Sequence, residues 1–497
     1  MSTLWFEPVG RGRHHVTLRY GVDDMRFTTT YWYDDVDFDG LEQRYGAGML
    51  RVVEFHLLAF EANKAASLAP TAIDPGPYAD LVTEAFWELW STIFHHVWGV
   101  WRYENGLPEY RLPRPLLHAA GEGAGAPAVP NRELASERRG PRSGGHASVP
   151  PPINPITVGD GTDRLLVLCG GGKDSLVSMR LLERAGISYD TFVYSHSVYG
   201  SASFQHALID ELVERCAPQH RHRGWVLDDA MDAPLSAVYP ELGIERVVAA
   251  ETVSSYWTAL PVALQHGCTE VALGVTRSTD EHNLVWELTG ERINYLWGMS
   301  SAAEVLLHDY VRSNLFSNLR MFHLLRPVYD LNVFSALQRE LDAVPATHSC
   351  ARQKPWCGRC AKCIYVWMHY VAWLPAETVS QCFTANLFDL PENRSMLRKM
   401  LGLEGYKPTD CVGTVSEARL AFAMCRANGV GGVIADEIDA GGFVEEAPAT
   451  LARYAAVETP GPTFPPRLAR ELSGPLAGQA AITESYARDV LSLESLP

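Results

Sequence analysis

The sequence predicts an α/β protein built around a parallel sheet. Between residues 161 and 345, short apolar runs (LLVLC, DTFVYSH and EVALGV) alternate with helical stretches such as SLVSMRLLERAG. This alternation is typical of right-handed βαβ units. A glycine-rich turn joins the first run to its helix, and a tight group of four cysteines follows the last unit. Together these features indicate a ligand-binding α/β domain with an attached metal knuckle.

The composition excludes several classes of protein. The chain has 497 residues, of which 47% are hydrophobic, and a formal net charge of -17. Such a chain folds into a globular protein, and its acidity disfavours general nucleic-acid binding. The first residues, MSTLWFEPVG, have no apolar core of a signal peptide, and no long apolar run predicts a membrane span. Ten cysteines, four of them clustered, suggest metal binding in a reducing cytoplasm.

Five regions follow from the pattern along the chain. Residues 1–118 form an N-terminal α+β domain, with a hairpin over 14–34 and helices over Gly40 to Asn63 and Tyr78 to Trp101. Residues 119–160, rich in Gly, Ala, Pro and Ser, predict a flexible linker. Residues 161–345 form the α/β domain that contains the glycine-rich turn. A zinc knuckle and helical region (346–430) and a loosely structured tail (431–497) complete the chain.

The turn CGGGKDS carries the strongest functional signal. The turn does not match the Walker A pattern, because Val167 stands where that pattern has a glycine and Asp174 stands where it has a serine or threonine. It does not match GxGxxG either, because Ser175 stands at the third glycine position. The turn matches the pyrophosphate loop, Ser-Gly-Gly-x-Asp-Ser, of enzymes that cut ATP between its α and β phosphates. Here Gly170 replaces the usual first serine. The predicted nucleotide-binding residues are Gly170, Gly171, Gly172, Lys173, Asp174 and Ser175. An ordinary glycine turn is the alternative.

Cleavage at this position turns a substrate oxygen into an adenylate. A carboxylate joined to AMP loses its negative charge and gains a leaving group. Lys173 would hold the leaving pyrophosphate, and Asp174 would help to hold Mg²⁺ or order the loop. The loop thus predicts the cofactors ATP and Mg²⁺ and leaves the fate of the adenylate open.

The four clustered cysteines predict a structural zinc site. Cys350, Cys357, Cys360 and Cys363 have the spacing C-x6-C-x2-C-x2-C. The short turns allow four thiolates to converge on one Zn²⁺ ion, which then has no open coordination position. An iron–sulfur cluster and four unrelated thiols are the alternatives.

Polar residues that follow EVALGV are the other candidates, since α/β proteins bind ligands at the carboxyl ends of their strands. Arg277 could hold a carboxylate or phosphate, and Asp280 could be a second Mg²⁺ ligand. The same stretch carries Ser278, Glu281, His282 and Asn283, and YKPTDCVGTVSE adds Lys407, Cys411 and Glu417. A solvated polar loop is the alternative for each. His56, His95 and His96 lie in apolar helical contexts and predict core or surface residues.

The loop and the cysteines together resemble 7-cyano-7-deazaguanine synthase, a carboxylate-activating enzyme of about half this length. The chain more closely resembles the UDP-N-acetylmuramoyl-L-alanyl-L-glutamate epimerase family, which belongs to the PP-loop ATP pyrophosphatase (adenine nucleotide α hydrolase-like) superfamily. The resemblance is carried by EFHLLAFEANKAAS, RYENGLPEY, GGGKDSLVS, TRSTDEHNLVWELTGERIN, HSCARQKPWCGRCAKCIYVWM and LEGYKPTDCVGTVSEARLA, which are colinear over residues 40–425.

The resemblance implies an enzyme that splits ATP to AMP and pyrophosphate while inverting a terminal glutamate. The substrate is then a small molecule or a peptide carboxylate. The chain departs from the family after Asn294, where His-Gln-Tyr-Ser-Lys-Ser is replaced by YLWGMS and Met299 stands at the lysine position. A related peptide, of a natural-product pathway, fits as well as a peptidoglycan precursor. A ligase that forms an amide or a nitrile through the same adenylate is the alternative.

Overall fold

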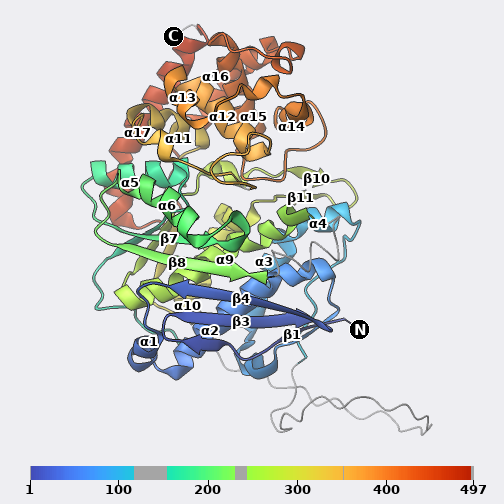
Figure 1. Ribbon diagram of the computed structural model, residues 1–497, viewed down its shortest axis with the longest axis vertical. Helices are drawn as coiled ribbons and strands as arrows, with labels where there is room; N and C mark the ends of the chain where they lie inside the picture. Colours follow the sequence, from blue (N-terminus) through green and yellow to red (C-terminus); the bar gives the residue numbers. More distant parts are fainter. Residues whose placement is uncertain (1, 117–153, 230–242, 351, 494–497) are drawn as a thin grey trace, which may run out of the picture.

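The computed structural model describes residues 2–116, 154–229, 243–350 and 352–493. Over these ranges the chain forms a ten-stranded mixed sheet with helices on both faces, and a separate two-stranded hairpin. Figure 1 shows the N-terminal strands (blue) at one end of the molecule and the C-terminal helices (orange to red) at the other.

The large sheet has the strand order β12-β9-β6-β7-β8-β4-β3-β1-β5, with β2 beside β3. Its strands are β1 (Thr3–Phe6), β2 (Gly10–Gly12), β3 (His15–Val22), β4 (Met25–Tyr33), β5 (Ala72–Asp74), β6 (Leu165–Leu168), β7 (Asp190–His196), β8 (Arg221–Asp228), β9 (Glu270–Leu273) and β12 (Arg320–His323). The hairpin consists of β10 (Leu284–Trp286) and β11 (Glu291–Ile293).

The predicted parallel sheet is confirmed, because β12, β9, β6, β7 and β8 all pair in parallel. Strand β6 shows why its residues are almost continuously apolar. Leu165 and Val167 belong to the core on one face, whereas Leu166 and Leu168 belong to the core on the other. A strand covered by helices on both faces has no polar side.

The helices divide between the two faces. The α-helices are α1 (Phe38–Tyr45), α2 (Ala47–Glu61), α3 (Glu84–Val97), α4 (Gly99–Glu104), α5 (Lys173–Arg184), α6 (Ala202–Val213), α9 (Gly243–His266), α10 (Ser301–Asn314), α11 (Asp330–Ala336), α12 (Ala361–Trp373), α13 (Ala376–Cys382), α14 (Arg394–Met400), α15 (Val415–Ala427), α16 (Gly441–Tyr454) and α17 (Pro466–Val490). One core joins α5, α6, α11 and the C-terminal helices, and the other joins α2, α3, α9 and α10. Within the described ranges, no helix has the length and apolar character to span a membrane.

The N-terminal region adds antiparallel strands to the same sheet. The predicted hairpin is confirmed as β3 and β4, and β4 pairs antiparallel with β8 of the parallel half. The helix predicted from Gly40 to Asn63 is divided into α1 and α2 at Gly46, whose φ of 85° suits glycine. The N-terminal strands and helices share a core with α9 and α10.

The prediction of a loosely structured tail from residue 431 is wrong. Residues 441–454 and 466–490 form α16 and α17, although each helix contains a proline, Pro448 and Pro475. A proline inside a helix costs roughly 3 kcal/mol. In α17 the buried stripe Leu468, Leu472 and Leu476 packs into the large C-terminal core and offsets that cost.

The predicted flexible linker falls mostly outside the described residues. Its last part, residues 154–160, lies against the folded protein: Ile156 forms a bridge to Phe316, and Val158 is buried. The side-chain amide of Asn318 also binds both backbone groups of Val158.

Candidate functional site

The glycine turn lies between β6 and α5, in the predicted strand–loop–helix order. Gly171 has a φ of 83°, and a Cβ at this position would come within 2.4 Å of the His348 ring. The backbone N–H of Gly170 donates to Ser175 Oγ at 3.2 Å. No side chain caps the first turn of α5, so its N-terminal amides and the positive end of the helix dipole suit an anion.

Lys173 and Asp174 lie at the start of α5. The Lys173 ammonium is buried, donates to Asp174 Oδ1 at 2.6 Å, lies 3.6 Å from Asp330 Oδ1 and stands over the Phe334 ring. Burial lowers the pKa of Lys173, but the carboxylates of Asp174 and Asp330 outweigh it, and the net pKa is raised. The lysine therefore stays charged in the interior, positioned beside the loop.

Asp330 holds this arrangement in place. It begins α11 and accepts hydrogen bonds from Thr276 Oγ1 at 2.7 Å and from Tyr365 at 3.2 Å. Burial raises the pKa of its carboxyl group, but Lys173 and Lys362 outweigh that effect and lower it. Asp330 is thus a buried carboxylate, compensated by hydrogen bonds and by two neighbouring cations.

A cavity of about 70 Å³ opens beside this group, at the carboxyl ends of β6 and β9. Its walls come from α5, from the segment after β9, from Leu296 and Met299, and from α11, α12 and the loop before α15. The lining residues are Lys173, Asp174, Gly274, Val275, Thr276, Ser278, Thr279, Leu296, Met299, Asp330, Lys362, Cys411, Val412 and Gly413. The structure therefore brings Lys173, Asp174, Ser278 and Cys411 together, as expected of residues that share a site.

Glu417 stands behind Ser278. Its carboxylate accepts from Ser278 Oγ at 3.0 Å and from the backbone N–H groups of Leu331 and Thr414, and the side chain is fully buried. Burial, reinforced by the charge of Asp330, raises its pKa to about 7, against the opposing effect of these donors. Such a carboxyl group can take up or release a proton near neutral pH.

The other candidates occupy different positions. Arg277 donates to the backbone oxygens of Arg326 and Thr459, each at 3.3 Å, and Asp280 accepts both the N–H and the hydroxyl of Ser301. Neither lines the cavity, and their catalytic roles stay predictions. The side-chain amide of Asn283 donates to the backbone oxygen of Lys407, and the Lys407 ammonium donates to the backbone oxygen of Glu281.

The remaining predicted candidates are accounted for by packing. Burial lowers the pKa of His56 to about 4, and the ring contacts Val52 and Tyr310 in the core. Burial raises the pKa of the cavity-lining Cys411 thiol to about 11, so it is protonated at neutral pH. His95 and His96 belong to α3 and lie near Glu291 of β11.

The four predicted cysteine ligands do converge. The Sγ atoms of Cys350, Cys357, Cys360 and Cys363 all lie within 4.8 Å of one another. Two of the separations are 3.7 Å (Cys350–Cys360) and 3.8 Å (Cys357–Cys363). Four sulfurs bound tetrahedrally at about 2.3 Å from one ion lie about 3.8 Å apart, so the arrangement fits a metal ion and is too open for a disulfide.

The cysteine segment touches the glycine turn directly. The N–H of His348 donates to Gly171 O at 2.8 Å, and its imidazole fills the space where a Cβ of residue 171 would stand. Ser349 packs beside Gly172, and Cys350 follows. A metal ion on the cysteines would thus fix the segment that supports the turn.

Four polar residues that line the cavity were not predicted from the sequence: Thr276, Thr279, Asp330 and Lys362. Asp330 had a recognisable signal, since RPVYDLNVFSA places an acidic residue at a helix start shortly after a strand. Lys362 lies between Cys360 and Cys363, and the sequence of this segment was interpreted only as a metal-binding pattern.

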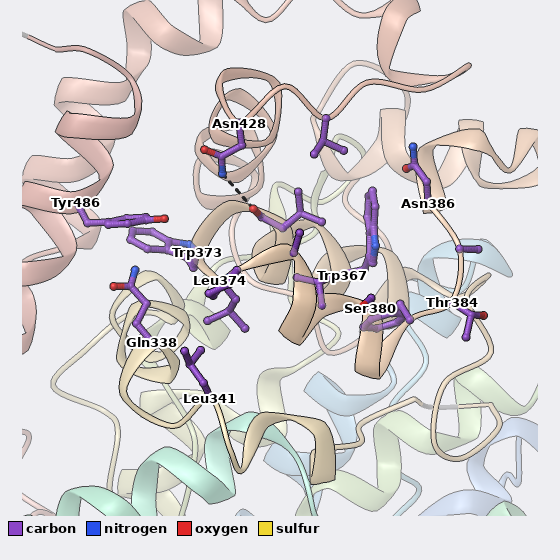
Figure 2. A pocket seen from close by; sticks show the side chains of 17 residues that line it. Gln338, Leu341, Trp367, Trp373, Leu374, Ser380, Thr384, Asn386, Asn428 and Tyr486 are labelled. Carbon is purple, nitrogen blue, oxygen red and sulfur yellow. Dashed lines mark hydrogen bonds between the residues drawn. The ribbon is translucent and has the colours of Figure 1, made fainter.

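A larger cavity, of about 820 Å³, lies elsewhere (Figure 2). It is formed by the end of α12, by α13 and by α17, with Trp367, Trp373 and Tyr486 in its walls. The described residues that line it include no charged side chain, and it shares none with the cavity beside the glycine turn. It offers no cation for a triphosphate.

Comparison with known proteins agrees with this geometry. Residues 346–430 match the MurL C-terminal domain family. The chain is 27% identical to the UDP-N-acetyl-alpha-D-muramoyl-L-alanyl-L-glutamate epimerase of Salinispora tropica over 389 residues, 76% of each chain. It is 28% identical to the protein of the same name from a Micromonospora species, over 67% of this chain and 73% of that one.

A third protein of that name, from Xanthomonas oryzae pv. oryzae, is 26% identical over 74% of this chain and 73% of its own length. This chain is thus similar, over most of its length, to proteins named as UDP-N-acetyl-alpha-D-muramoyl-L-alanyl-L-glutamate epimerases. The resemblance predicted from the sequence is therefore confirmed. The matched MurL domain contains the cysteine cluster, Lys407, Cys411 and Glu417.

The contact between Gly171 and His348 makes a testable prediction. Gly171→Ala places a methyl group against the imidazole and on a left-handed backbone. It should lower the free energy of unfolding by about 1–3 kcal/mol in denaturant titrations. Gly170→Ala is the matched control, because nothing lies within 4 Å of its added Cβ. Equal effects of the two substitutions would contradict this account.

Proposed function

We propose that this protein is an ATP-dependent epimerase. It adenylates the terminal carboxylate of UDP-N-acetylmuramoyl-L-alanyl-L-glutamate or a related peptide, inverts the adjacent α-carbon, and releases AMP and pyrophosphate. One observation carries the proposal. In a relative of proteins named as epimerases, an uncapped glycine turn opens beside a cavity that is lined by the buried Lys173–Asp174 pair.

In the first half of the reaction, the turn from Gly170 to Ser175 binds the phosphates of ATP in a PP-loop fold. The substrate carboxylate attacks the α-phosphorus, and the bond from this phosphorus to the bridging oxygen of pyrophosphate breaks. The α5 amides and the Lys173 ammonium stabilise the charge that develops on the leaving group. Asp174 would hold Mg²⁺, which neutralises phosphate charge.

In the second half, the activated ester makes the substrate α-proton more acidic. A base removes the proton, a proton returns to the opposite face, and water cleaves the acyl–phosphate bond to give AMP and the inverted acid. Glu417 has a pKa suited to this exchange, and Ser278 lies between it and the cavity. We assign proton transfer to this pair. Arg277 and Asp280 keep their predicted roles in substrate and Mg²⁺ binding as hypotheses.

The cavity wall also bears on the substrate. Met299, at the position of the family's lysine, lines the cavity together with Leu296. This wall is apolar where a lysine would offer a positive charge. A substrate with an uncharged group at this point fits it better than one with an extra carboxylate or phosphate.

Isotope exchange tests the whole proposal. In heavy water, the enzyme with ATP, Mg²⁺ and UDP-N-acetylmuramoyl-L-alanyl-L-glutamate should produce AMP, pyrophosphate and deuterium at the glutamate α-carbon. Mass spectrometry and phosphorus NMR detect all three. AMP without deuterium would instead favour a ligase of the 7-cyano-7-deazaguanine synthase kind.

Asp174→Asn tests the nucleotide half. Loss of the carboxylate that meets Lys173 and faces the cavity should lower the rate of AMP formation at least about 100-fold. Asp24→Asn, in the exposed turn between β3 and β4, is the control and should retain wild-type activity. An active Asp174→Asn enzyme would refute the assignment of the loop.

Glu417→Gln tests the proton-transfer half. Because Glu417 acts when ionised, the wild-type rate should rise with pH through about 7, and the variant should lose roughly 100-fold or more in epimerisation. Its adenylation, followed by pyrophosphate exchange, should persist. A variant with the same pH–rate profile as the wild type would exclude this role.

The same group affects stability in the opposite direction. Its pKa rises from 4.5 to about 7 on folding, so the folded protein binds the proton more tightly. The stability from the protonated form is complete below pH 4.5 and is lost as the pH rises through about 7. Between pH 5 and 8 the wild type should lose on the order of 3 kcal/mol relative to Glu417→Gln. Denaturant titrations at several pH values measure this difference.

We expect a zinc ion on the four cysteines to stabilise the segment that contacts the glycine turn. The four thiolates would hold Zn²⁺ without an open position, as a structural site beside the glycine turn. Cys357→Ser should lose one zinc ion per chain, measured by elemental analysis, and should unfold at a lower temperature. Unchanged zinc content, or iron with acid-labile sulfide in the wild type, would exclude a structural zinc site.

A further inference from the structure

A second group of possible metal ligands lies at the amino ends of the parallel strands, away from the carboxyl ends where the glycine turn lies. Asp35 follows β4, His222 is the second residue of β8, and His266 is the last residue of α9. Asp35 Oδ2 lies 2.5 Å from His222 Nδ1 and 3.1 Å from His266 Nε2. These amino ends are those of β7 and β8, whereas the glycine turn lies at the carboxyl end of β6.

The hydrogen bonding of this group is incomplete. Among the described residues, Asp35 Oδ1 and His222 Nε2 are buried atoms without a hydrogen-bond partner, and His266 Nε2 has only its ion-pair contact with Asp35 Oδ2. The His222 side chain is almost fully buried, whereas Asp35 and His266 are partly open to solvent. Buried polar atoms are normally paired, so the incomplete pairing of this group needs an explanation.

His222 stands between two carboxylates. Its Nδ1 faces Asp35, and its Nε2 lies 3.8 Å from Asp190 Oδ2. A neutral imidazole would turn a lone pair towards one of these carboxylates. Each nitrogen therefore needs a positive partner, either two protons on an imidazolium ion or one proton and one metal ion.

The second ring favours the metal ion. The His222 and His266 rings stack with centroids 4.0 Å apart, and both point to the same Asp35 oxygen. A single divalent ion beside this oxygen can bind both rings in neutral form. Asp190 would then accept the remaining N–H of His222, as outer carboxylates do for metal-bound histidines.

We propose that Asp35, His222 and His266 bind one divalent transition-metal ion such as zinc, separate from the four-cysteine site. Two imidazoles and one carboxylate suit zinc and its neighbours in the first transition row, and leave one position for water. Tetrahedral bonds of about 2.0 Å separate ligand atoms by about 3.3 Å, so Asp35, on a partly exposed loop, needs only a small outward shift.

The surrounding charges are compatible with this ion. Asp190 also binds Arg164 at 3.0 Å and His220 at 2.9 Å, and neither of these side chains contacts Asp35 in the described part of the chain. Asp34 adds a further carboxylate beside Asp35 and accepts the N–H of Arg223. The other histidine group, His95, His96 and Glu291, differs because the buried Arg102 guanidinium already binds Glu291 at 2.6 Å.

The ion would join three distant segments. Asp35 ends the antiparallel hairpin, His222 begins the last parallel strand, and His266 ends α9. These segments meet where β4 pairs with β8. The site would therefore clamp the N-terminal strands to the parallel half of the sheet.

Metal analysis of the full chain tests the proposal. Wild type, His266→Ala, Asp35→Asn and His220→Ala are loaded with zinc, desalted and analysed for zinc per chain. His266→Ala and Asp35→Asn should each bind one zinc ion fewer than the wild type, and His220→Ala should equal it. Equal zinc in all four proteins would overturn the proposal.

Cobalt distinguishes the two sites and controls for folding. In Cys357→Ser protein, added Co²⁺ should give weak visible bands from the histidine site, and His266→Ala in this background should abolish them while leaving unchanged any thiolate charge transfer from Cys350, Cys360 and Cys363. Asp35→Asn is nearly isosteric, so its circular dichroism should match the wild type while its metal is lost. Loss of metal only together with loss of folded structure, or an absence of these bands in Cys357→Ser, would count against the site.

Discussion

The contact between His348 and Gly171 is the constraint on which the site depends. One backbone hydrogen bond and one ring, set against a residue that cannot carry a side chain, join the cysteine segment to the glycine turn. The turn follows a strand buried on both faces, and the cysteine segment leads into α12. The backbone shape of the glycine turn is therefore determined by residues about 175 positions apart in the sequence.

Buried charge is the second organising feature of the site. Lys173, Asp330 and Glu417 are all buried, and each is compensated by a different element of the fold. Thr276 and Tyr365 donate to Asp330, and the Ser278 hydroxyl donates to Glu417 and accepts the N–H of Asp330. Removing one member of such a network leaves an uncompensated charge in the interior. The polar groups of the cavity consequently act as a unit, and substitutions among them will not have additive effects.

Local sequence patterns predicted much of the fold, together with the glycine turn and the four cysteines. The parallel strands, the β3–β4 hairpin and the convergence of the four cysteines follow from periodicity and spacing, which depend on near neighbours. Asp330 has a local signal as the first residue of a helix, but its meeting with Lys173 and Thr276 depends on tertiary packing, which no local pattern contains. The prediction for residues 431–497 was wrong for a different reason. The Gly, Ala and Pro content of this segment suggested a loose structure, although the regular spacing of Leu468, Leu472 and Leu476 is that of the buried face of a helix.

The pairing of β4 with β8 has a consequence for how this protein can be divided. In most open parallel sheets the last strand is an edge, but here β8 is covered along most of its length by an antiparallel neighbour from the N-terminus. Removing the first 116 residues would expose the backbone N–H and C=O groups of β8, together with apolar side chains that α2 and α3 now cover. Such an edge invites pairing between chains. The half of the protein that carries the glycine turn is therefore not an independent module, and gain or loss of the N-terminal strands requires a compensating change along β8.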